Sequence, residues 1–256
     1  MEDWYETWFE SPLYEVLYAD RDDEEAARLI ELLVNYLPDQ DDLKVLDLGC
    51  GRGRHAINLY KNVNSLYKKG FRVTGIDLSA RAIAEAKRQA KKDQLEGITF
   101  KVQDMRKPLP DKFDAILNLF TTFGYFEEDA ENTRVLDSVK QMLQPGGAFV
   151  LDYLNAVKVQ SELVPAEEGT IRDISYGISR YVSEQAVHKE IAFSGGAIEG
   201  QRHYSEHVKL YGLDWFRKQL TDRGFVIDKL YGNYSGDAFD PQSSDRLLMI
   251  SYLEGE

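Results

Sequence analysis

The feature that most constrains the fold of this chain is a strand that runs into a glycine-rich turn. The stretch 45–48 is apolar except for Asp47, and Gly49, Gly51 and Gly53 follow at alternate positions. The residues after them have the pattern of a helix. Glycine lets the backbone turn tightly and approach a ligand closely, and the first turn of a helix offers free N–H groups. This order of elements predicts a nucleotide-type binding site at the end of the strand.

The spacing of the glycines discriminates between kinds of nucleotide site. A dinucleotide fingerprint, G-x-G-x-x-G, needs a third glycine where the chain has Arg54, and a P-loop needs a Gly-Lys-Ser/Thr ending that is absent. A second strand, 71–77, ends in Asp77, and an acid at this place can hold the two ribose hydroxyls of an adenosine. Asp77 could instead cap the next helix, but Ser79 is the better cap, so the ribose role is favoured.

Strands and helices alternate through the first part of the chain. Strands are expected at 44–48, 71–76, 98–102, 113–119 and 147–153, and helices at 22–37, 53–68, 79–92 and 129–143. This alternation predicts an α/β fold with a doubly wound, mostly parallel sheet. After a further helix, 213–223, the runs 225–231 and 246–253 are expected to complete the sheet as antiparallel strands, giving about seven strands in all.

After the fifth strand the pattern changes to β structure. We expect three β segments, 170–183, 186–194 and 197–210, with Gly195-Gly196 as the hairpin turn between the last two. Such an antiparallel β-meander is an insertion into the α/β pattern. The polar, glycine-containing loop 232–244, between the two final strands, is expected to be mobile.

Five motifs occur in the order and at the spacing of a known family. They are Asp47-x-Gly49-x-Gly51-x-Gly53, Gly75-Ile76-Asp77-Leu78-Ser79, Val102-Gln103-Asp104-Met105, the strand Phe113 to Phe120, and Leu143-Gln144-Pro145-Gly146-Gly147. On these motifs the chain resembles the class I S-adenosylmethionine-dependent methyltransferases, whose sheet is Rossmann-like. One departure is the stretch 61–70, which looks longer than usual, although both flanking strands keep their motifs.

The resemblance implies one methyltransferase domain over residues 1–256. It would comprise an N-terminal helical cap (1–42), a cofactor-binding core (43–155), a β-meander insertion (165–211), and a C-terminal helix and strands (212–256) that complete the sheet.

The resemblance also implies a site for S-adenosyl-L-methionine, with S-adenosyl-L-homocysteine as the product. The backbone at Gly49 and Gly51 would pass under the methionine part, and Asp77 would hold the ribose. Asp47 would orient the loop or face the ligand's ammonium group through water. Asn118, at the end of the fourth strand, would lie in the same crevice, because ligands bind at the carboxyl ends of such strands.

The same resemblance assigns three residues to the adenine. Leu78 and Met105 would sandwich the ring, a contact that suits polarisable sulfur, and Asp104 would accept a hydrogen from the adenine amino group. Leu78 and Met105 could equally be ordinary core residues.

The N-terminal segment is dense in aromatic residues, with spacings of four as in Trp4–Trp8 and Tyr14–Tyr18. Small-molecule methyltransferases similar to glycine N-methyltransferase place a tyrosine and an arginine from this region against the cofactor. By that resemblance Arg21 would pair with the cofactor carboxylate, and Tyr14 or Tyr18 would pack over it. An aromatic patch that docks on the core would show the same pattern.

The acceptor pocket is less defined. Candidates at the ends of the fourth and fifth strands are Phe123, Tyr125, Tyr153 and Asn155. His203 and His207 are candidate bases that a spacing of four puts on one strand face, although exposed strand histidines would look the same. No catalytic residue is assigned, because the sulfonium makes a dedicated base optional. No metal site is expected from one cysteine and four scattered histidines.

Composition narrows the partners. A formal net charge of −13 works against a polyanionic substrate, so nucleic acid is disfavoured. The single Cys50 excludes an intramolecular disulfide and fits a reducing compartment. With no apolar run of transmembrane length and no signal peptide, we expect a cytoplasmic protein without a membrane partner. A homodimer is possible, since β insertions often mediate dimers in similar enzymes.

The predicted function is methyl transfer from S-adenosyl-L-methionine to a nitrogen or oxygen of a small molecule, by in-line displacement. Two alternatives stay open. An RNA or protein methyltransferase would need a basic rim or a recognition domain, and neither is apparent. A non-catalytic S-adenosylmethionine-binding regulatory protein would carry the same cofactor motifs. A nicotinamide enzyme is disfavoured by the missing third glycine.

Overall fold

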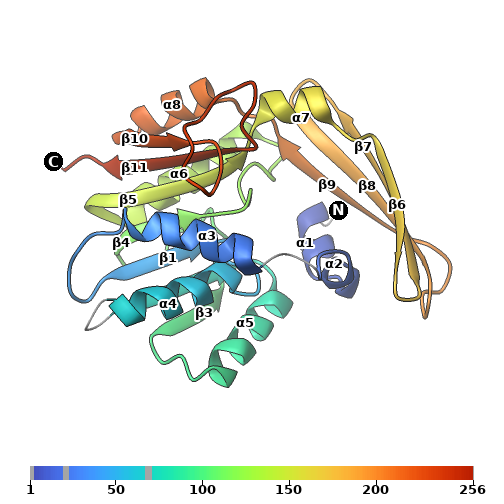
Figure 1. Cartoon of the computed structure of the whole chain (residues 1–256), viewed down its shortest axis with the longest axis horizontal. Helices are drawn as coiled ribbons and strands as arrows, with labels where there is room; N and C mark the ends of the chain where they lie inside the picture. The colour runs from blue at the N-terminus through green and yellow to red at the C-terminus, as the bar shows by residue number, and fades with distance from the viewer. Residues whose placement is uncertain (1–2, 20–22, 67–70, 256) are drawn as a thin grey trace.

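The computed structural model describes residues 3–19, 23–66 and 71–255. The chain forms a seven-stranded sheet with helices on both faces, and a four-stranded sheet stands beside it (Figure 1). The strand order of the larger sheet is β10-β11-β5-β4-β1-β2-β3. The prediction of an α/β fold with a doubly wound, Rossmann-like sheet is confirmed.

The larger sheet is parallel except at its C-terminal end. Its strands are β1 (Lys44–Leu48), β2 (Arg72–Asp77), β3 (Ile98–Val102), β4 (Phe113–Asn118), β5 (Leu143–Leu154), β10 (Phe225–Tyr231) and β11 (Arg246–Leu253). Strand β11 pairs antiparallel with both β5 and β10, as predicted. The register sets Asp47 beside Gly75 and Leu48 beside Ile76, so β1 and β2 end at the same edge.

Helices cover both faces of this sheet because its strands are apolar on both sides. One face of the sheet, to which the Val45 side chain points, is covered by three helices, α3 (Asp23–Val34), α4 (Arg54–Leu66) and α5 (Ala80–Lys92). Helices α6 (Asp129–Met142) and α8 (Leu213–Thr221) pack on the face of Leu46 and Leu48. Within the described residues no helix is long and apolar enough to cross a membrane. The edge at the carboxyl ends of the parallel strands is left for ligands.

The smaller sheet is an antiparallel meander that follows the short helix α7 (Ala156–Glu162). Its strands are β6 (Ala166–Ile171), β7 (Ile174–Val182), β8 (Ala186–Gly195) and β9 (Arg202–Lys209). The prediction of three β segments was wrong, because 170–183 contains a hairpin whose turn has no glycine. Arg172 takes the left-handed conformation there, with φ of 57°, which a search for glycine or asparagine cannot detect.

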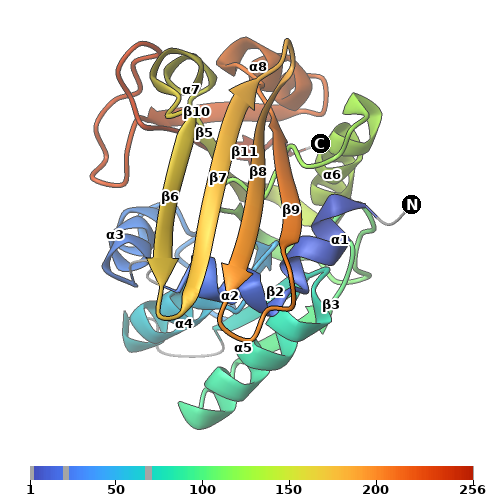
Figure 2. The same ribbon diagram turned by 90° about the vertical axis from the view of Figure 1, so that its right-hand side faces the viewer.

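Helices α1 (Trp4–Phe9) and α2 (Pro12–Leu17) lie between the two sheets, behind the smaller sheet in Figure 2. Ser11 caps α2 by accepting a hydrogen bond from the Leu13 amide at 3.2 Å. The side chain of Trp8 is completely buried and packs with Ile178 and Phe193 of the smaller sheet. The N-terminal aromatic residues therefore join the insertion to the body of the protein.

The loop between β10 and β11, for which the sequence predicts mobility, makes hydrogen bonds to itself and to the body of the protein. Tyr231 forms an isolated β-bridge with Ala238. The Asn155 side chain donates hydrogen bonds to the carbonyl oxygens of Pro241 at 2.9 Å and Ser244 at 2.8 Å. Glycine and polar residues indicated a loop, but only the fold shows which backbone groups it meets.

Candidate functional site

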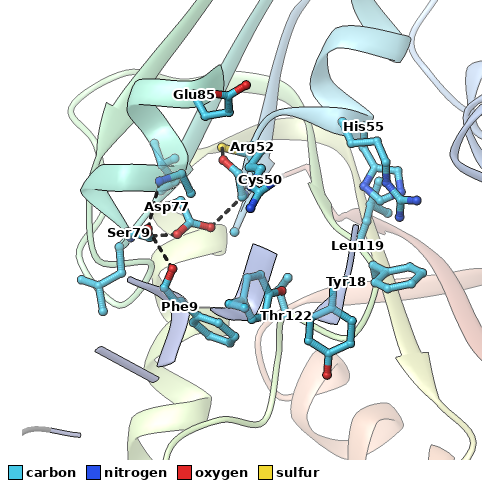
Figure 3. Close-up of a pocket in the computed structure, with 18 of the residues that line it drawn as sticks. Phe9, Tyr18, Cys50, Arg52, His55, Asp77, Ser79, Glu85, Leu119 and Thr122 are labelled. Carbon is cyan, nitrogen blue, oxygen red and sulfur yellow. Dashed lines mark hydrogen bonds between the residues drawn. The ribbon is translucent and has the colours of Figure 1, made fainter. Parts of the chain in front are cut away.

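A cavity of about 610 Å³ lies at the carboxyl edge of the larger sheet (Figure 3). Its wall comes from the loops that follow β1, β2, β3 and β4, and from helices α1, α2, α4 and α5. Ligands of open α/β sheets bind at this edge. The predicted site residues are therefore expected to line this cavity.

The glycine loop forms the floor of the cavity. Gly49 and Gly51 have φ of 81° and 53°, a left-handed conformation that favours glycine. A Cβ atom on Gly49 would lie 2.8 Å from the Cβ of Thr122, whereas one on Gly51 would meet nothing within 4 Å. Gly49 thus lets the β4 loop pack closely, and Gly51 presents open backbone to the cavity. Cys50 is buried between them, and burial raises the pKa of its thiol.

Asp77 ties the end of β2 to the glycine loop. Its Oδ2 accepts a hydrogen bond from the Gly51 amide, and its Oδ1 accepts one from the Ser79 amide, both at 2.8 Å (Figure 3). Burial raises the pKa of Asp77, and the two amide donors oppose that rise. Ser79 caps α5 by accepting from the Ala82 amide at 3.0 Å, as predicted. Asp77 lines the cavity, where its assignment to the ribose stays a prediction.

The three residues assigned to the adenine line the same cavity. They are Leu78, Asp104 and Met105. Leu78 is 37% exposed and so is not a core residue. The Arg106 guanidinium lies 2.7 Å from Asp104 Oδ2 and also pairs with Glu131. Burial would raise the pKa of Asp104, but the hydrogen bonds and charge of Arg106 hold it below its usual value, so the carboxylate is an ionised, oriented acceptor.

Two predicted residues lie behind the cavity wall. Asp47 is 2% exposed, and burial together with the charge of Asp77 raises the pKa of Asp47 to about 7. Asn118 is completely buried, and its Nδ2 donates to the Leu48 carbonyl at 2.8 Å and to Thr122 Oγ1 at 2.7 Å. Neither side chain lines the cavity. Asn118 instead joins the end of β1 to the loop after β4.

The N-terminal helices bring Tyr14 and Tyr18 to the cavity, whereas Arg21 lies outside the described residues. The Tyr18 hydroxyl donates to Glu206 Oε1 at 2.7 Å, and Lys189 Nζ donates to the same hydroxyl. Burial lowers the pKa of Lys189, and the charge of Glu206 opposes that effect. Tyr18 therefore has its ring on the cavity and its hydroxyl anchored on the smaller sheet.

Of the four acceptor-pocket candidates, only Tyr125 lines the cavity. Phe123 and Tyr153 are buried with Phe216 on the face of the sheet that α6 and α8 cover. The Tyr153 hydroxyl donates to the Lys209 carbonyl. Asn155 caps α7 and is buried. These three predictions were wrong because position at a strand end does not determine which face a side chain takes.

The two candidate histidines share one face of β9, as predicted, but neither lines the cavity. His203 is exposed. His207 Nε2 accepts a hydrogen bond from Trp4 Nε1 at 3.2 Å and lies 3.4 Å from a Glu127 carboxylate oxygen. Burial lowers the pKa of His207. Its neighbours make it a contact of α1 rather than a base for the cavity. In the described part of the chain no group of three or more histidine, cysteine or acidic side chains could hold a metal ion.

Sequence reasoning missed several residues of the wall. Phe9 comes from α1, Phe120 and Thr122 from the loop after β4, Arg52 from the glycine loop, and Arg54 is the first residue of α4. Phe120 and Thr122 lie in the loop that follows a strand ending at the binding edge, and this position is the signal that would have found them.

The cavity suits S-adenosyl-L-methionine. The backbone at Gly51 can approach a ligand without any side chain between, and the Asp77 carboxylate and the ionised Asp104 stand along the same wall. A flat apolar ring fits beside the exposed Leu78. The aromatic side chains of Phe9, Tyr14, Tyr18, Phe120 and Tyr125 line the part supplied by α1, α2 and the loop after β4.

Comparison with known proteins agrees with this geometry. The methyltransferase domain family matches residues 39–209. A putative methyltransferase of Geobacillus sp. (strain WCH70) is 26% identical over 220 residues, which cover 81% of this chain and 83% of that protein. The dTDP-3-amino-3,4,6-trideoxy-α-D-glucopyranose N,N-dimethyltransferase of Streptomyces venezuelae is 24% identical over 237 residues, or 88% and 93% of the two chains. The crystal structure of an S-adenosylmethionine-dependent methyltransferase from Clostridium acetobutylicum shares the fold, with a TM-score of 0.77, 20% identity and coverage of 94% and 96%.

Proposed function

The chain belongs to the methyltransferase domain family, and on that premise we propose that it transfers the methyl group of S-adenosyl-L-methionine to an amino group of a small molecule. The observation that carries the proposal is the cavity at the strand ends. Its 610 Å³ are within the range of small-molecule sites, and α1 and α2 form part of its wall. A cofactor and a small acceptor fit a space of that size.

S-adenosyl-L-methionine supplies a methyl group on a positively charged sulfur. The contribution of the protein is to align the acceptor with that methyl group and to exclude water. Asp77 and the open backbone of Gly51 are the groups proposed to hold the adenosine and methionine parts. The aromatic side chains of α1, α2 and the β4 loop shield the other part from water.

An amine is favoured over a hydroxyl by the aromatic part of the wall. The faces of Phe and Tyr rings attract cations, so they can hold an amine in its ammonium form. The ammonium group gives up a proton to solvent before the nitrogen lone pair attacks the methyl carbon, and the carbon–sulfur bond then breaks to leave S-adenosyl-L-homocysteine. The Streptomyces venezuelae relative, named as an N,N-dimethyltransferase of an amino sugar nucleotide, is consistent with this choice. Oxygen methylation is the alternative within the same site.

The first experiment is calorimetric titration with S-adenosyl-L-methionine and, in parallel, with NADH. Saturable binding of the first alone is expected. A panel of small amines and matched alcohols is then tested for formation of S-adenosyl-L-homocysteine. Turnover with amines supports the proposal, and turnover with alcohols alone would replace it by O-methylation. Turnover that needs added RNA or protein would favour a macromolecular substrate. Binding without any turnover would favour a regulatory protein.

Three finer parts of the proposal concern partners and location. We propose that nucleic acid is not a substrate, which the formal charge of −13 supports. We propose a homodimer through the outward face of the smaller sheet, where Tyr181 is 51% exposed, and light scattering on the purified protein tests it. A cytoplasmic location is proposed on the single cysteine, Cys50, which cannot form an intramolecular disulfide.

A further inference from the structure

Two consecutive residues in the loop after β4 have a left-handed backbone although neither is glycine. Phe120 has φ of 57° and Thr121 has φ of 59°. L-residues with side chains rarely adopt this conformation, and such residues persist only where their surroundings hold them. Phe120 also lines the cavity. The conformation of these two residues therefore shapes the wall of the proposed active site.

Asp152, near the end of β5, holds both backbone amides. Its side chain is completely buried, and its Oδ2 accepts hydrogen bonds from the Phe120 amide at 2.8 Å and from the Tyr234 hydroxyl at 2.7 Å. Its backbone carbonyl accepts from the Thr121 amide at 3.0 Å. One residue thus satisfies the amide groups of both left-handed residues.

Arg246 completes this arrangement from the last strand. Its Nε donates to Asp152 Oδ1 at 2.9 Å, and its Nη2 donates to Thr121 Oγ1 at 2.8 Å. Its guanidinium lies over the Phe120 ring at 5.7 Å from the centroid, and that of Arg54 lies over the same ring at 5.0 Å. Arg246 reaches this place because β11 runs antiparallel to β5, which brings its first residue to the carboxyl edge of the sheet.

We propose that Asp152 and Arg246 are positioning residues, which hold Phe120 and Thr121 in the left-handed conformation and so set the Phe120 ring on the wall where methyl transfer occurs. This proposal rests on the proposed function. A role in sheet stability alone would not need the contacts to the Phe120 amide and the Thr121 hydroxyl. Strands β5 and β11 are already joined by seven paired residues, from Arg246 with Leu154 to Tyr252 with Ala148.

The test uses Arg246→Lys, which keeps the charge but loses the planar fork that serves Asp152 and Thr121 together. Thr121→Val and Tyr234→Phe each remove one hydrogen bond and leave the ion pair intact, so the test survives if Arg246→Lys does not fold. The matched control is Arg223→Lys. The guanidinium of Arg223, just after α8, pairs with Asp137 of α6 at 2.7 Å, and neither residue lines the cavity.

Two quantities are measured on each full-length variant. The first is amide hydrogen exchange of the segment 119–122, which requires no ligand. The second is kcat and KM with S-adenosyl-L-methionine and the amine from the panel that the wild-type protein methylates fastest. Arg246→Lys is expected to speed exchange of the Phe120 and Thr121 amides and to lower kcat by about tenfold with a smaller change in KM, since small misplacements near the reacting atoms are costly. Thr121→Val is expected to lower kcat by about threefold.

Arg223→Lys is expected to leave both quantities at the wild-type values. If the amides of residues 119–122 exchanged at the wild-type rate in both Arg246→Lys and Thr121→Val, the proposal would be overturned, because the loop would then hold its conformation without these contacts. Faster amide exchange with an unchanged kcat would also overturn it, since the position of the Phe120 ring would then have no effect on methyl transfer. Failure of the wild-type protein to bind S-adenosyl-L-methionine would refute the proposed function itself, and the exchange data would still decide whether the pair holds the loop.

Discussion

The Oδ2 atom of Asp77 lies 2.8 Å from the amide nitrogen of Gly51, and this hydrogen bond joins the ends of β1 and β2 across the floor of the cavity. The other carboxylate oxygen is bound by the Ser79 amide. Each carboxyl oxygen has two lone-pair sites and accepts one of these two amide hydrogens, so Asp77 retains acceptor capacity for a ligand. The residue that shapes the glycine loop is thus also the residue proposed to hold the ribose.

Replacement of Asp77 by asparagine is expected to weaken binding of S-adenosyl-L-methionine by about 10-fold to 100-fold, the range for loss of charged hydrogen bonds. One side-chain oxygen cannot serve both amides and the ribose. Calorimetric titration measures the effect, and Asp214→Asn, at an exposed position on α8, is the control. Equal affinities for the two variants would defeat the ribose assignment.

Alanine at Gly51 and at Gly53 is expected to have different consequences. Both glycines have positive φ, so both variants carry about 1–2 kcal/mol of backbone cost. A Cβ at Gly53 would also lie 2.7 Å from the Phe100 ring, so Gly53→Ala is expected to lose about 1–3 kcal/mol more in unfolding free energy. Gly51→Ala is expected to stay folded but to bind S-adenosyl-L-methionine weakly, because its methyl group enters the cavity.

Urea denaturation and calorimetric titration on both alanine variants check this pair of expectations. If Gly51→Ala bound S-adenosyl-L-methionine as tightly as the wild-type protein, the backbone there would not approach the cofactor. If Gly53→Ala were no less stable than Gly51→Ala, its contact with Phe100 would not limit packing.

Asp47 is expected to make stability depend on pH. Its pKa is about 7 in the folded protein and 3.8 ordinarily, so the folded state keeps a proton that the unfolded chain releases between these values. The free energy of unfolding contributed by Asp47 therefore falls as pH rises from about 4 to about 7, by up to about 4 kcal/mol. Asp47→Asn, which cannot ionise, is expected to be more stable than the wild-type protein at pH 8.

Urea denaturation at pH 4.5, 6 and 8 measures that difference. Its growth with pH is the diagnostic feature, because a simple packing effect of the amide would be the same at each pH. Asp77 is present in the wild-type protein and in Asp47→Asn, so its own titration contributes to the unfolding free energy of both. A difference that does not change with pH would show that Asp47 is ionised throughout this range.

Glu206 is expected to hold the N-terminal helices to the smaller sheet. Its Oε1 accepts from Trp8 Nε1 at 2.6 Å and from the Tyr18 hydroxyl at 2.7 Å, and Lys189 lies 3.6 Å from Oε2. Glu206→Ala would leave a buried indole N–H and a partly buried ammonium group without this partner, so it is expected to cost about 2–3 kcal/mol. Hydrogen exchange should increase in α1 and α2.

The matched control is Glu184→Ala, at an exposed position in the turn between β7 and β8, which is expected to change little. Urea denaturation and amide exchange of residues 4–17 report the two effects. Equal exchange in the two variants would mean that apolar packing around Trp8 alone holds the helices.

The amino-acid sequence by itself determined the α/β fold and part of the wall of the cavity. Glycines at 49 and 51, the acid at 77 and the motif around Asp104 are local features, because backbone conformation and strand ends depend on a few neighbouring residues. Each of six residues around the cavity was predicted from its local sequence alone. They are Gly49, Gly51, Asp77, Leu78, Asp104 and Met105.

Only the tertiary structure decided which side chains reach the cavity and which are covered. The sequence puts Asn118, Phe123 and Tyr153 at or near strand ends that reach the binding edge. In the structure their side chains are buried by packing and do not line the cavity. Arg246 lies 125 residues after Thr121 and bonds to it only because β11 runs antiparallel beside β5. Pairing between distant strands is set by the free energy of the whole core, so no local pattern in the sequence records it.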